Sequence, residues 1–327
     1  MQETLDVLIV GAGPTGLACA IEAVANNLKL LTVEKGVLVN SIYNYPTTMT
    51  FFTSRERLEI GNLPFPSLNT KPHRAEALEY YRRAADFYRL PIRFQERVMG
   101  ISGRDGAFHV HTETTEGQRG EYITKKAIIA TGYYDLPNLI SVPGEDLPKV
   151  SHYYTGPHPF YRRKVAVIGG ANSAAVASLD LWRHGAEVTL IFREPALGTN
   201  LKYWILPDIQ NRIKDGDIRA LPESEVKEIV PGSVCVHRKN GEVLHIENDF
   251  VLALTGYHPD FDFLRDIGVE IDPQTQRPVC DTETRESNVP GIYLAGVIIA
   301  GMDTNEIFIE NGRFHGKQIL SDIVKKL

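Results

Sequence analysis

Two glycine-rich segments constrain the fold of this chain more than any other feature. They read Gly-Ala-Gly-Pro-Thr-Gly at residues 11–16 and Gly-Gly-Ala-Asn-Ser-Ala at residues 169–174. Each follows a short apolar run rich in β-branched residues and precedes small residues typical of a helix. A strand, a glycine loop and a helix in this order place a pyrophosphate on the helix N-terminus. Two such segments predict two dinucleotide sites, and therefore electron transfer between two dinucleotides.

The first segment has the spacing of a complete dinucleotide site. A predicted strand over residues 6–10 leads into it, and its three glycines would permit a sharp turn, backbone approach to phosphate and close helix packing, in that order. A second predicted strand, residues 29–33, ends at Glu34, at the distance downstream where an acid binds ribose hydroxyls. Without this acid the segment would read as an ordinary glycine turn.

The order of segments favours FAD at the first site. The strand predicted over residues 126–132 ends in Ala-Thr-Gly, and the strand at residues 291–296 ends in Ala-Gly. At both points the chain resembles two-dinucleotide flavoproteins, where their chain leaves and re-enters the flavin domain. Such proteins commonly follow the second glycine with an aspartate that binds the ribityl chain, whereas this chain has Val297. The flavin contact there is expected from the backbone or from another residue.

The second segment has Ala171 in place of the middle glycine of the pattern. It also has Ala174 in place of the last glycine, a position where alanine is common. The next predicted strand, residues 187–192, ends at Arg193 rather than at an acid, and an arginine there accommodates a 2′-phosphate. This predicts NADPH rather than NADH, although the acid Glu194 follows directly. Alternatively, Arg193 is a solvated charge at the end of a strand.

These segments predict a doubly wound α/β chain with two Rossmann-like domains, one of them discontinuous. Residues 1–136 and 261–327 would form the FAD domain, and residues 137–260 would form the NADPH domain. Proline-rich turns mark the expected linkers. A chain of 327 residues is long enough for both domains.

Composition narrows the class of partner. The 35 basic and 41 acidic residues give a net charge of −6, which argues against non-specific nucleic-acid binding. The sequence holds no apolar run of about 18 residues and no secretory signal before the first strand, so we expect a cytoplasmic protein without a membrane partner. The expected partners are therefore small molecules.

The three cysteines, Cys19, Cys235 and Cys280, form no Cys-x-x-Cys pair. This excludes an electron relay of the thioredoxin-reductase type. Cys19 lies among small residues of the first helix and is interpreted as a buried hydrophobe, with a redox role as the alternative. Cys235, in an alternating strand pattern, is interpreted as structural, and Cys280, near a charged loop, as incidental. His109 and His111 alternate on a predicted strand as solvated neighbours, and no metal site is expected.

Several longer segments resemble the bacillithiol-disulfide reductase (YpdA-type) family of flavoproteins. The segments are residues 34–36, 40–46, 51–54, 130–134, 203–207, 295–297, 307–312 and 314–316. The resemblance spans nearly the whole chain. It implies FAD, a preference for NADPH, and a thioredoxin-reductase-like fold without the cysteine pair. It further implies reduction of a low-molecular-weight thiol disulfide such as bacillithiol disulfide, a role in redox homeostasis, and a homodimer or homotetramer.

One residue departs from this family. The family usually carries a cysteine, proposed as the redox thiol, where this chain has Thr15. A hydroxyl does not exchange with a disulfide, because that chemistry needs a thiolate. Either the reduced flavin reacts with the acceptor directly, or the acceptor is a ferredoxin, a flavodoxin or a quinone. A flavin-dependent monooxygenase and a non-catalytic nucleotide-binding protein are the alternatives from other classes.

Each cofactor has a predicted set of binding residues, and hydride passes from NADPH to the flavin. The FAD set is Gly11, Gly13, Pro14, Thr15, Gly16, Glu34, Lys35, Gly36, Ser41, Tyr43, Asn44, Tyr45, Pro46, Val98, Ala130, Thr131, Gly132, Gly296, Val297, Glu306 and Ile307. The NADPH set is Gly169, Gly170, Ala171, Asn172, Ser173, Ala174, Arg193, Thr255, Gly256 and Tyr257. The predicted catalytic set is Thr15 with Lys202 and Trp204, which would clamp nicotinamide or substrate.

Several of these assignments carry a specific expectation. Val98, at the end of a predicted strand, would contact adenine through its backbone. Glu306 and Ile307 would direct backbone N–H groups at the pyrimidine edge of the flavin. Tyr43 and Tyr45 would stack on the flavin or belong to the core. For Trp204 the alternative is a core position beside a solvated Lys202.

Overall fold

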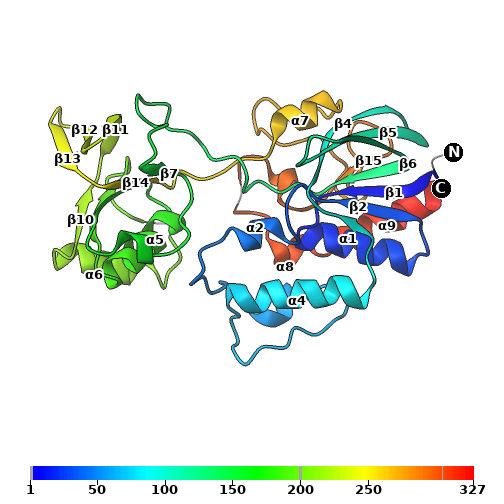
Figure 1. Cartoon of the computed structure of the whole chain (residues 1–327), viewed down its shortest axis with the longest axis horizontal. Helices are drawn as coiled ribbons and strands as arrows, with labels where there is room; N and C mark the ends of the chain where they lie inside the picture. Colours follow the sequence, from blue (N-terminus) through cyan, green and yellow to red (C-terminus); the bar gives the residue numbers. More distant parts are fainter. Residues whose placement is uncertain (1–2, 199–200, 304) are drawn as a thin grey trace. The chain divides into compact units, whose positions relative to one another are not determined.

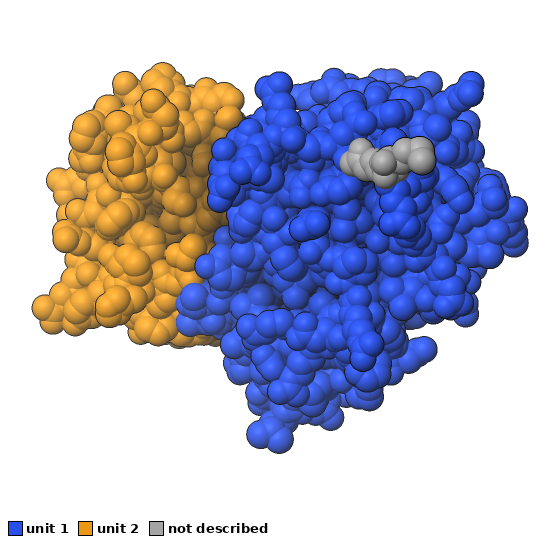
Figure 2. Space-filling model, turned by 45° about the vertical axis from the view of Figure 1, so that its right-hand side comes forward, with its two compact units in different colours: residues 1–136, 257–327 blue, residues 137–256 orange. Residues whose placement is uncertain are grey.

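The structure is a computed structural model that describes residues 3–198, 201–303 and 305–327. The chain forms two compact units (Figure 2). Unit 1 comprises residues 1–136 and 257–327, and unit 2 comprises residues 137–256. Each unit contains a parallel sheet with a glycine loop at the end of its first long strand, so the predicted α/β class is confirmed.

Unit 1 is built on a seven-stranded sheet in the order β3-β2-β1-β6-β5-β4, with β15 also paired to β6. The strands are β1 (Leu5–Val10), β2 (Leu30–Val33), β3 (Ile92–Arg93), β4 (Glu96–Arg104), β5 (Ala107–Thr114), β6 (Arg119–Ile129) and β15 (Ile292–Leu294). The first half of β6 pairs antiparallel with β5, and its second half runs parallel to β1 and β15. Strand β6 therefore joins a parallel nucleotide-binding sheet to an antiparallel extension.

Helices cover both faces of the parallel strands of unit 1. They are α1 (Pro14–Ala25), α2 (Asn40–Tyr43), α3 (Arg55–Leu58), α4 (Arg74–Phe87), α7 (Phe261–Asp266), η2 (Gly296–Ala300), α8 (Ile309–Gly312) and α9 (His315–Lys326). Figure 1 shows α1 and α9 side by side against the sheet. Val7 and Ile9 of β1 pack with these two helices, while Leu8 and Val10 pack on the opposite face. Cys19 is fully buried between α1 and the sheet, as predicted.

Unit 2 repeats the nucleotide-binding pattern with an all-parallel sheet in the order β10-β9-β8-β14-β7. Its elements are β7 (Val150–Ser151), η1 (His158–Phe160), β8 (Lys164–Ile168), α5 (Asn172–Arg183), β9 (Glu187–Ile191), α6 (Leu206–Lys214), β10 (Ile218–Leu221) and β14 (Phe250–Ala253). A separate antiparallel sheet contains β11 (Ser224–Val230), β12 (Ser233–Arg238) and β13 (Val243–Glu247) (Figure 1).

Two further observations concern the whole described chain. Among the described residues, no helix combines the length and apolar character that a membrane crossing requires. Within the same residues, no three His, Cys, Asp or Glu side chains are grouped as a metal site. His109 and His111 lie on β5 beside Glu121.

Candidate functional site

The first glycine loop joins β1 to α1 in unit 1, and two of its glycines are required by the protein itself. Gly11 has a φ of +104°, and a Cβ atom there would lie 2.6 Å from the carbonyl oxygen of Ala130. A Cβ atom at Gly16 would lie 2.0 Å from the carbonyl oxygen of Gly11. At Gly13, by contrast, a Cβ atom would meet nothing within 4 Å. The protein therefore leaves open space at the glycine that is predicted to approach phosphate.

Glu34 lies directly after β2 and is buried against this loop. One carboxylate oxygen accepts the N–H of Ala12 at 2.8 Å, and the other accepts the N–H of Gly36 at 2.9 Å. Burial raises the pKa of Glu34, and these two hydrogen bonds oppose the rise. Each oxygen keeps a second lone pair for a ribose hydroxyl. Sequence reasoning proposed the ribose contact and missed that Glu34 also fastens the loop to the end of β2.

Three segments meet around the side chain of Thr15, which is half-buried. A Cβ atom at Gly312 would lie 3.0 Å from Thr15 Oγ1, and one at Gly296 would lie 3.2 Å from it. The N–H of Gly296 donates to Nδ1 of His315 at 3.0 Å. The structure thus brings Thr15 and Gly296 together, as the predicted FAD set requires. Sequence reasoning gave no role to Gly312 or His315, although both lie in segments that resemble the family.

The segment 40–46 places its two tyrosines in different surroundings. Tyr43 is exposed at the end of α2, with the guanidinium of Arg74 5.6 Å from its ring centre. Tyr45 packs edge-on against Tyr134, with ring centres 5.0 Å apart, and Tyr134 lies 4.5 Å from Tyr257. Burial raises the pKa of Tyr45 well above its usual value. Tyr257, assigned to the NADPH set, therefore belongs to an aromatic cluster of unit 1.

Three further members of the predicted FAD set lie at separate places in unit 1. Ala130 follows β6 directly, and its N–H donates to the carbonyl of Val10 at 2.8 Å, so this residue lies against the glycine loop. Lys35 forms an ion pair with Asp135 at 2.8 Å. Val98 lies near the start of β4 rather than at a strand end, because β4 continues to Arg104 in its pairing with β5.

The turn before α8 uses one of the two backbone donors that were predicted to face the flavin. The N–H of Glu306 donates to the carbonyl of Asp303 at 3.2 Å, within the turn itself. The carboxylate of Glu306 pairs with Arg277, and its carbonyl accepts from Nδ2 of Asn311 at 3.0 Å. Ile307 remains the candidate for a backbone contact with the cofactor.

The second glycine loop joins β8 to α5 in unit 2. Gly169 has a φ of +139°, and a Cβ atom there would lie 2.5 Å from the carbonyl oxygen of Leu254. Ala171 precedes α5 at the position that Gly13 holds before α1. A Cβ atom at Gly170 would lie 2.6 Å from Oε2 of Glu194. Glu194, rather than the exposed Arg193, therefore reaches the loop.

Further members of the predicted NADPH and catalytic sets lie in the segment after β9 and at the boundary of unit 2. Oδ1 of Asn172 accepts the N–H of Lys202 at 2.9 Å, which places the segment after β9 against the start of α5. Trp204 is partly exposed and packs edge-on against Tyr203 at 4.8 Å. The hydroxyl of Thr255 donates to the carbonyl of Asn138 at 2.6 Å, where the chain enters and leaves unit 2.

Comparisons with known proteins agree with this geometry. The family model described as pyridine nucleotide-disulphide oxidoreductase matches residues 8–296. The bacilliredoxin reductase Bdr of Bacillus subtilis (strain 168) is 46% identical over 319 residues, which cover 98% of this chain and 97% of that protein. The structure of bacillithiol disulfide reductase Bdr (YpdA) from Bacillus cereus has a TM-score of 0.97 at 45% identity, covering 99% of this chain and 100% of that one.

A more distant structure confirms the predicted fold. Thioredoxin reductase from T. acidophilum has a TM-score of 0.77 at 24% identity, with 99% of each chain covered. The resemblance to the bacillithiol-disulfide reductase family and the thioredoxin-reductase-like fold are both confirmed. The chain belongs to the pyridine nucleotide-disulphide oxidoreductase family and is an NAD(P)H-dependent oxidoreductase.

Proposed function

We propose that this chain uses FAD and NADPH to reduce a low-molecular-weight thiol disulfide such as bacillithiol disulfide. The observation that carries the cofactor assignment is the open space at Gly13, between two glycines that the fold itself requires. The disulfide acceptor follows the name of the B. cereus structure, which is similar over nearly the whole chain. When bound, FAD would accept a hydride from NADPH and pass the electrons on to the disulfide.

Residues of unit 1 supply the binding interactions for FAD. The first hydrogen bond of α1 runs from the N–H of Leu17 to the carbonyl of Gly13 at 2.9 Å, so the N–H groups of Thr15 and Gly16 have no partner within the helix and would bind the pyrophosphate. Glu34 is placed to accept ribose hydroxyls with its remaining lone pairs. Thr15 lies beside Gly296, so its hydroxyl would face the middle of the cofactor.

The first glycine loop offers no reactive thiol for exchange with a disulfide. Thr15 carries no sulfur, and burial raises the pKa of the nearby Cys19 to about 12. A thiolate is the reactive form of cysteine, so Cys19 is inert at neutral pH. We therefore propose that the acceptor is reduced by the bound cofactor directly, without a relay thiol at this loop.

We propose unit 2 as the NADPH domain, with the second loop on the pyrophosphate. Gly169 has the positive φ and the close backbone contact that the loop turn requires. Arg193 supports a 2′-phosphate, while Glu194 beside Gly170 would repel it. The cytoplasmic location and a homodimer or homotetramer remain proposals from the sequence and the resemblance.

The name of the B. subtilis relative supports a second acceptor, a bacilliredoxin. An anaerobic stopped-flow experiment separates the two. The flavin of the purified enzyme is bleached with NADPH or NADH, and the reduced enzyme is then mixed with bacillithiol disulfide or with an oxidised bacilliredoxin. Rapid bleaching by NADPH and re-oxidation by bacillithiol disulfide support the proposal. Re-oxidation by bacilliredoxin alone would move the acceptor to that partner, and no bleaching would contradict the FAD and NADPH assignment.

A further inference from the structure

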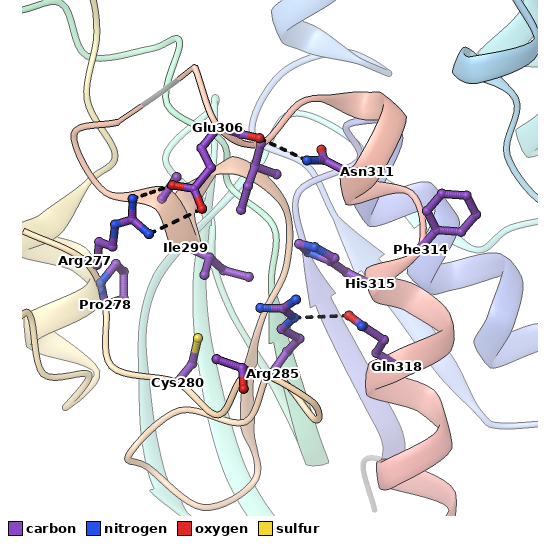
Figure 3. A pocket seen from close by; sticks show the side chains of 13 residues that line it. Arg277, Pro278, Cys280, Arg285, Ile299, Glu306, Asn311, Phe314, His315 and Gln318 are labelled. Atoms are coloured by element: carbon purple, nitrogen blue, oxygen red, sulfur yellow. Dashed lines mark hydrogen bonds and ion pairs between the residues drawn. The ribbon is translucent and has the colours of Figure 1, made fainter.

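A cavity of about 510 Å³ opens in unit 1 between residues 277–285, η2 and the start of α9 (Figure 3). Its lining is polar on the side of Arg285, His315 and Gln318 and apolar at Ile299. Figure 3 shows the guanidinium of Arg285 directed into the cavity between Cys280 and His315. The cavity is large enough for a small organic ligand.

The two arginines of the cavity differ in their partners. Arg277 is neutralised by the carboxylate of Glu306. Nε of Arg285 donates to the neutral amide oxygen Oε1 of Gln318 at 3.1 Å, and no carboxylate of the described residues forms an ion pair with Arg285. The nearby Asp281 forms no direct ion pair with Arg285, because its Oδ1 accepts the N–H groups of Glu283 and Thr284, but the charge of Arg285 contributes to lowering the pKa of its carboxyl. Among the described residues, Arg285 therefore has no directly paired carboxylate, and its guanidinium faces the cavity with Asp281 as a nearby counter-charge.

His315 presents a hydrogen-bond donor to the cavity and no acceptor. Its Nδ1 accepts the N–H of Gly296, so the proton of the neutral ring lies on Nε2. Burial and, to a smaller extent, the charge of Arg285 together lower the pKa of His315 to about 4. The ring points toward the cavity (Figure 3). A guanidinium and an imidazole N–H together are suited to a carboxylate, which a guanidinium binds with two parallel hydrogen bonds.

The same residues connect the cavity to the first glycine loop. His315 holds the N–H of Gly296, and Gly296 lies against Thr15. Ile307, the candidate cofactor contact, also lines the cavity. A ligand held at Arg285 would thus extend toward the loop at which FAD is proposed to bind.

We propose that this cavity binds the electron acceptor, a small thiol disulfide that carries a carboxylate, and that Arg285 anchors the carboxylate. This inference rests on the proposed function and specifies its substrate class. A disulfide with a neutral or cationic end lacks the partner for Arg285, so the cavity selects anionic acceptors.

Binding is tested on the oxidised holoenzyme through Cys280, which lies in the cavity beside Arg285. Suberate has the length of dithiodipropionate without its disulfide, and octanediol is the matched neutral probe. We expect suberate to slow iodoacetamide labelling of Cys280 by about fivefold or more, with octanediol without effect, because the carboxylate pairs with the guanidinium. Labelling of Cys235, measured on the same sample by peptide mass spectrometry, is the internal reference. Equal protection by suberate in Arg285→Gln and in the unchanged enzyme would overturn the proposal.

Selectivity is tested by turnover of two disulfides of similar size, dithiodipropionate and dithiodiethanol. In Arg285→Gln, the ratio of kcat/KM for the anionic over the neutral disulfide should fall about tenfold, the value of one charge-assisted hydrogen bond. Arg285→Lys should restore part of the ratio. The control Arg119→Gln removes an exposed guanidinium of β6 and should keep the ratio. An unchanged ratio in Arg285→Gln would refute the anchor.

These measurements separate the inference from the proposed function. If NADPH bleaches the enzyme but neither disulfide is reduced, the disulfide acceptor is wrong, and suberate protection of Cys280 still decides whether the cavity binds a carboxylate. If both disulfides are reduced with equal efficiency and suberate gives no protection, the proposed function stands and the carboxylate subsite is wrong.

Discussion

Alanine substitutions at Gly13 and Gly16 separate what the cofactor requires from what the fold requires. Both glycines belong to the first loop, only three residues apart. A Cβ atom at Gly16 would lie 2.0 Å from a backbone oxygen of Gly11, which has no freedom to move away, whereas a Cβ atom at Gly13 would meet no protein atom within 4 Å. Gly16→Ala should therefore destabilise the apoprotein, and Gly13→Ala should not.

The magnitudes follow from these contacts. Overpacking at Gly16 should cost about 1–3 kcal/mol, which exceeds the gain of up to about 1 kcal/mol in helix propensity. At Gly13, with φ −71°, the reduced freedom of the unfolded chain should contribute about 0.4–1 kcal/mol, and the weaker helix cap should offset it by a similar amount. If the pyrophosphate approaches Gly13, the methyl group introduced by Gly13→Ala should weaken FAD binding by about tenfold or more, equivalent to about 1.4 kcal/mol.

The assay measures two quantities on the apoprotein of each variant: the free energy of unfolding in urea, and the dissociation constant of FAD from the quenching of its fluorescence. Gly232→Ala is the control, because a Cβ atom there also meets nothing within 4 Å and the residue lies in unit 2. Wild-type FAD affinity in Gly13→Ala would refute the assignment of this loop to the pyrophosphate. Wild-type stability in Gly16→Ala would refute the steric argument.

Three further predictions concern single side chains. Glu34→Gln turns one of two accepting oxygens into an NH₂ group that faces a backbone N–H, so the apoprotein should lose about 1–3 kcal/mol in urea unfolding, while the exposed control Glu116→Gln should not. His315 is neutral when folded, with a pKa of about 4, and the unfolded state binds its proton from pH 6.5 downward, so stability should fall by about 2.5 kcal/mol between pH 7.5 and 4.5. His315→Gln should remove that part of the slope, and parallel pH profiles of the two proteins would contradict the assignment. Glu194→Gln should raise the preference for NADPH over NADH by about tenfold in kcat/KM, because the carboxylate beside Gly170 no longer repels the 2′-phosphate. The control Glu242→Gln should keep the preference. An unchanged preference in Glu194→Gln would show that Glu194 does not face the coenzyme.

Local pattern was enough to predict the elements that carry the loops. The strand predicted at residues 164–168 is β8, and the strand predicted at 6–10 differs from β1 by one residue. These runs are buried on both faces in a parallel sheet, so their composition alone identifies them. Glu34 was found for the same reason, because the distance from loop to acid is fixed by one helix and one strand.

Contacts between distant segments were beyond such reasoning. Nothing in the local sequence indicates that His315 accepts the N–H of Gly296, or that the N–H of Glu306 is used within its own turn. Tyr134 and Tyr257 are far apart in sequence and meet only because the chain leaves and re-enters unit 1 at neighbouring places. The second loop shows the same limit, since Arg193 ends the predicted strand, yet the side chain that reaches Gly170 is Glu194.

The two glycine loops also differ in a way that suits their proposed ligands. At the first loop the position before the helix is Gly13, with open space around it, and Glu34 fastens the neighbouring backbone through two hydrogen bonds. At the second loop the corresponding position is Ala171, whose methyl group limits backbone approach, and the exposed Glu194 lies beside the loop in place of a buried acid. A preformed, open loop favours a tightly held cofactor, because little ordering is required on binding. A loop with a side chain at the approach point and an acid beside it binds phosphate less tightly, which favours a coenzyme that binds and leaves in each turnover, as electron transfer from NADPH through FAD requires.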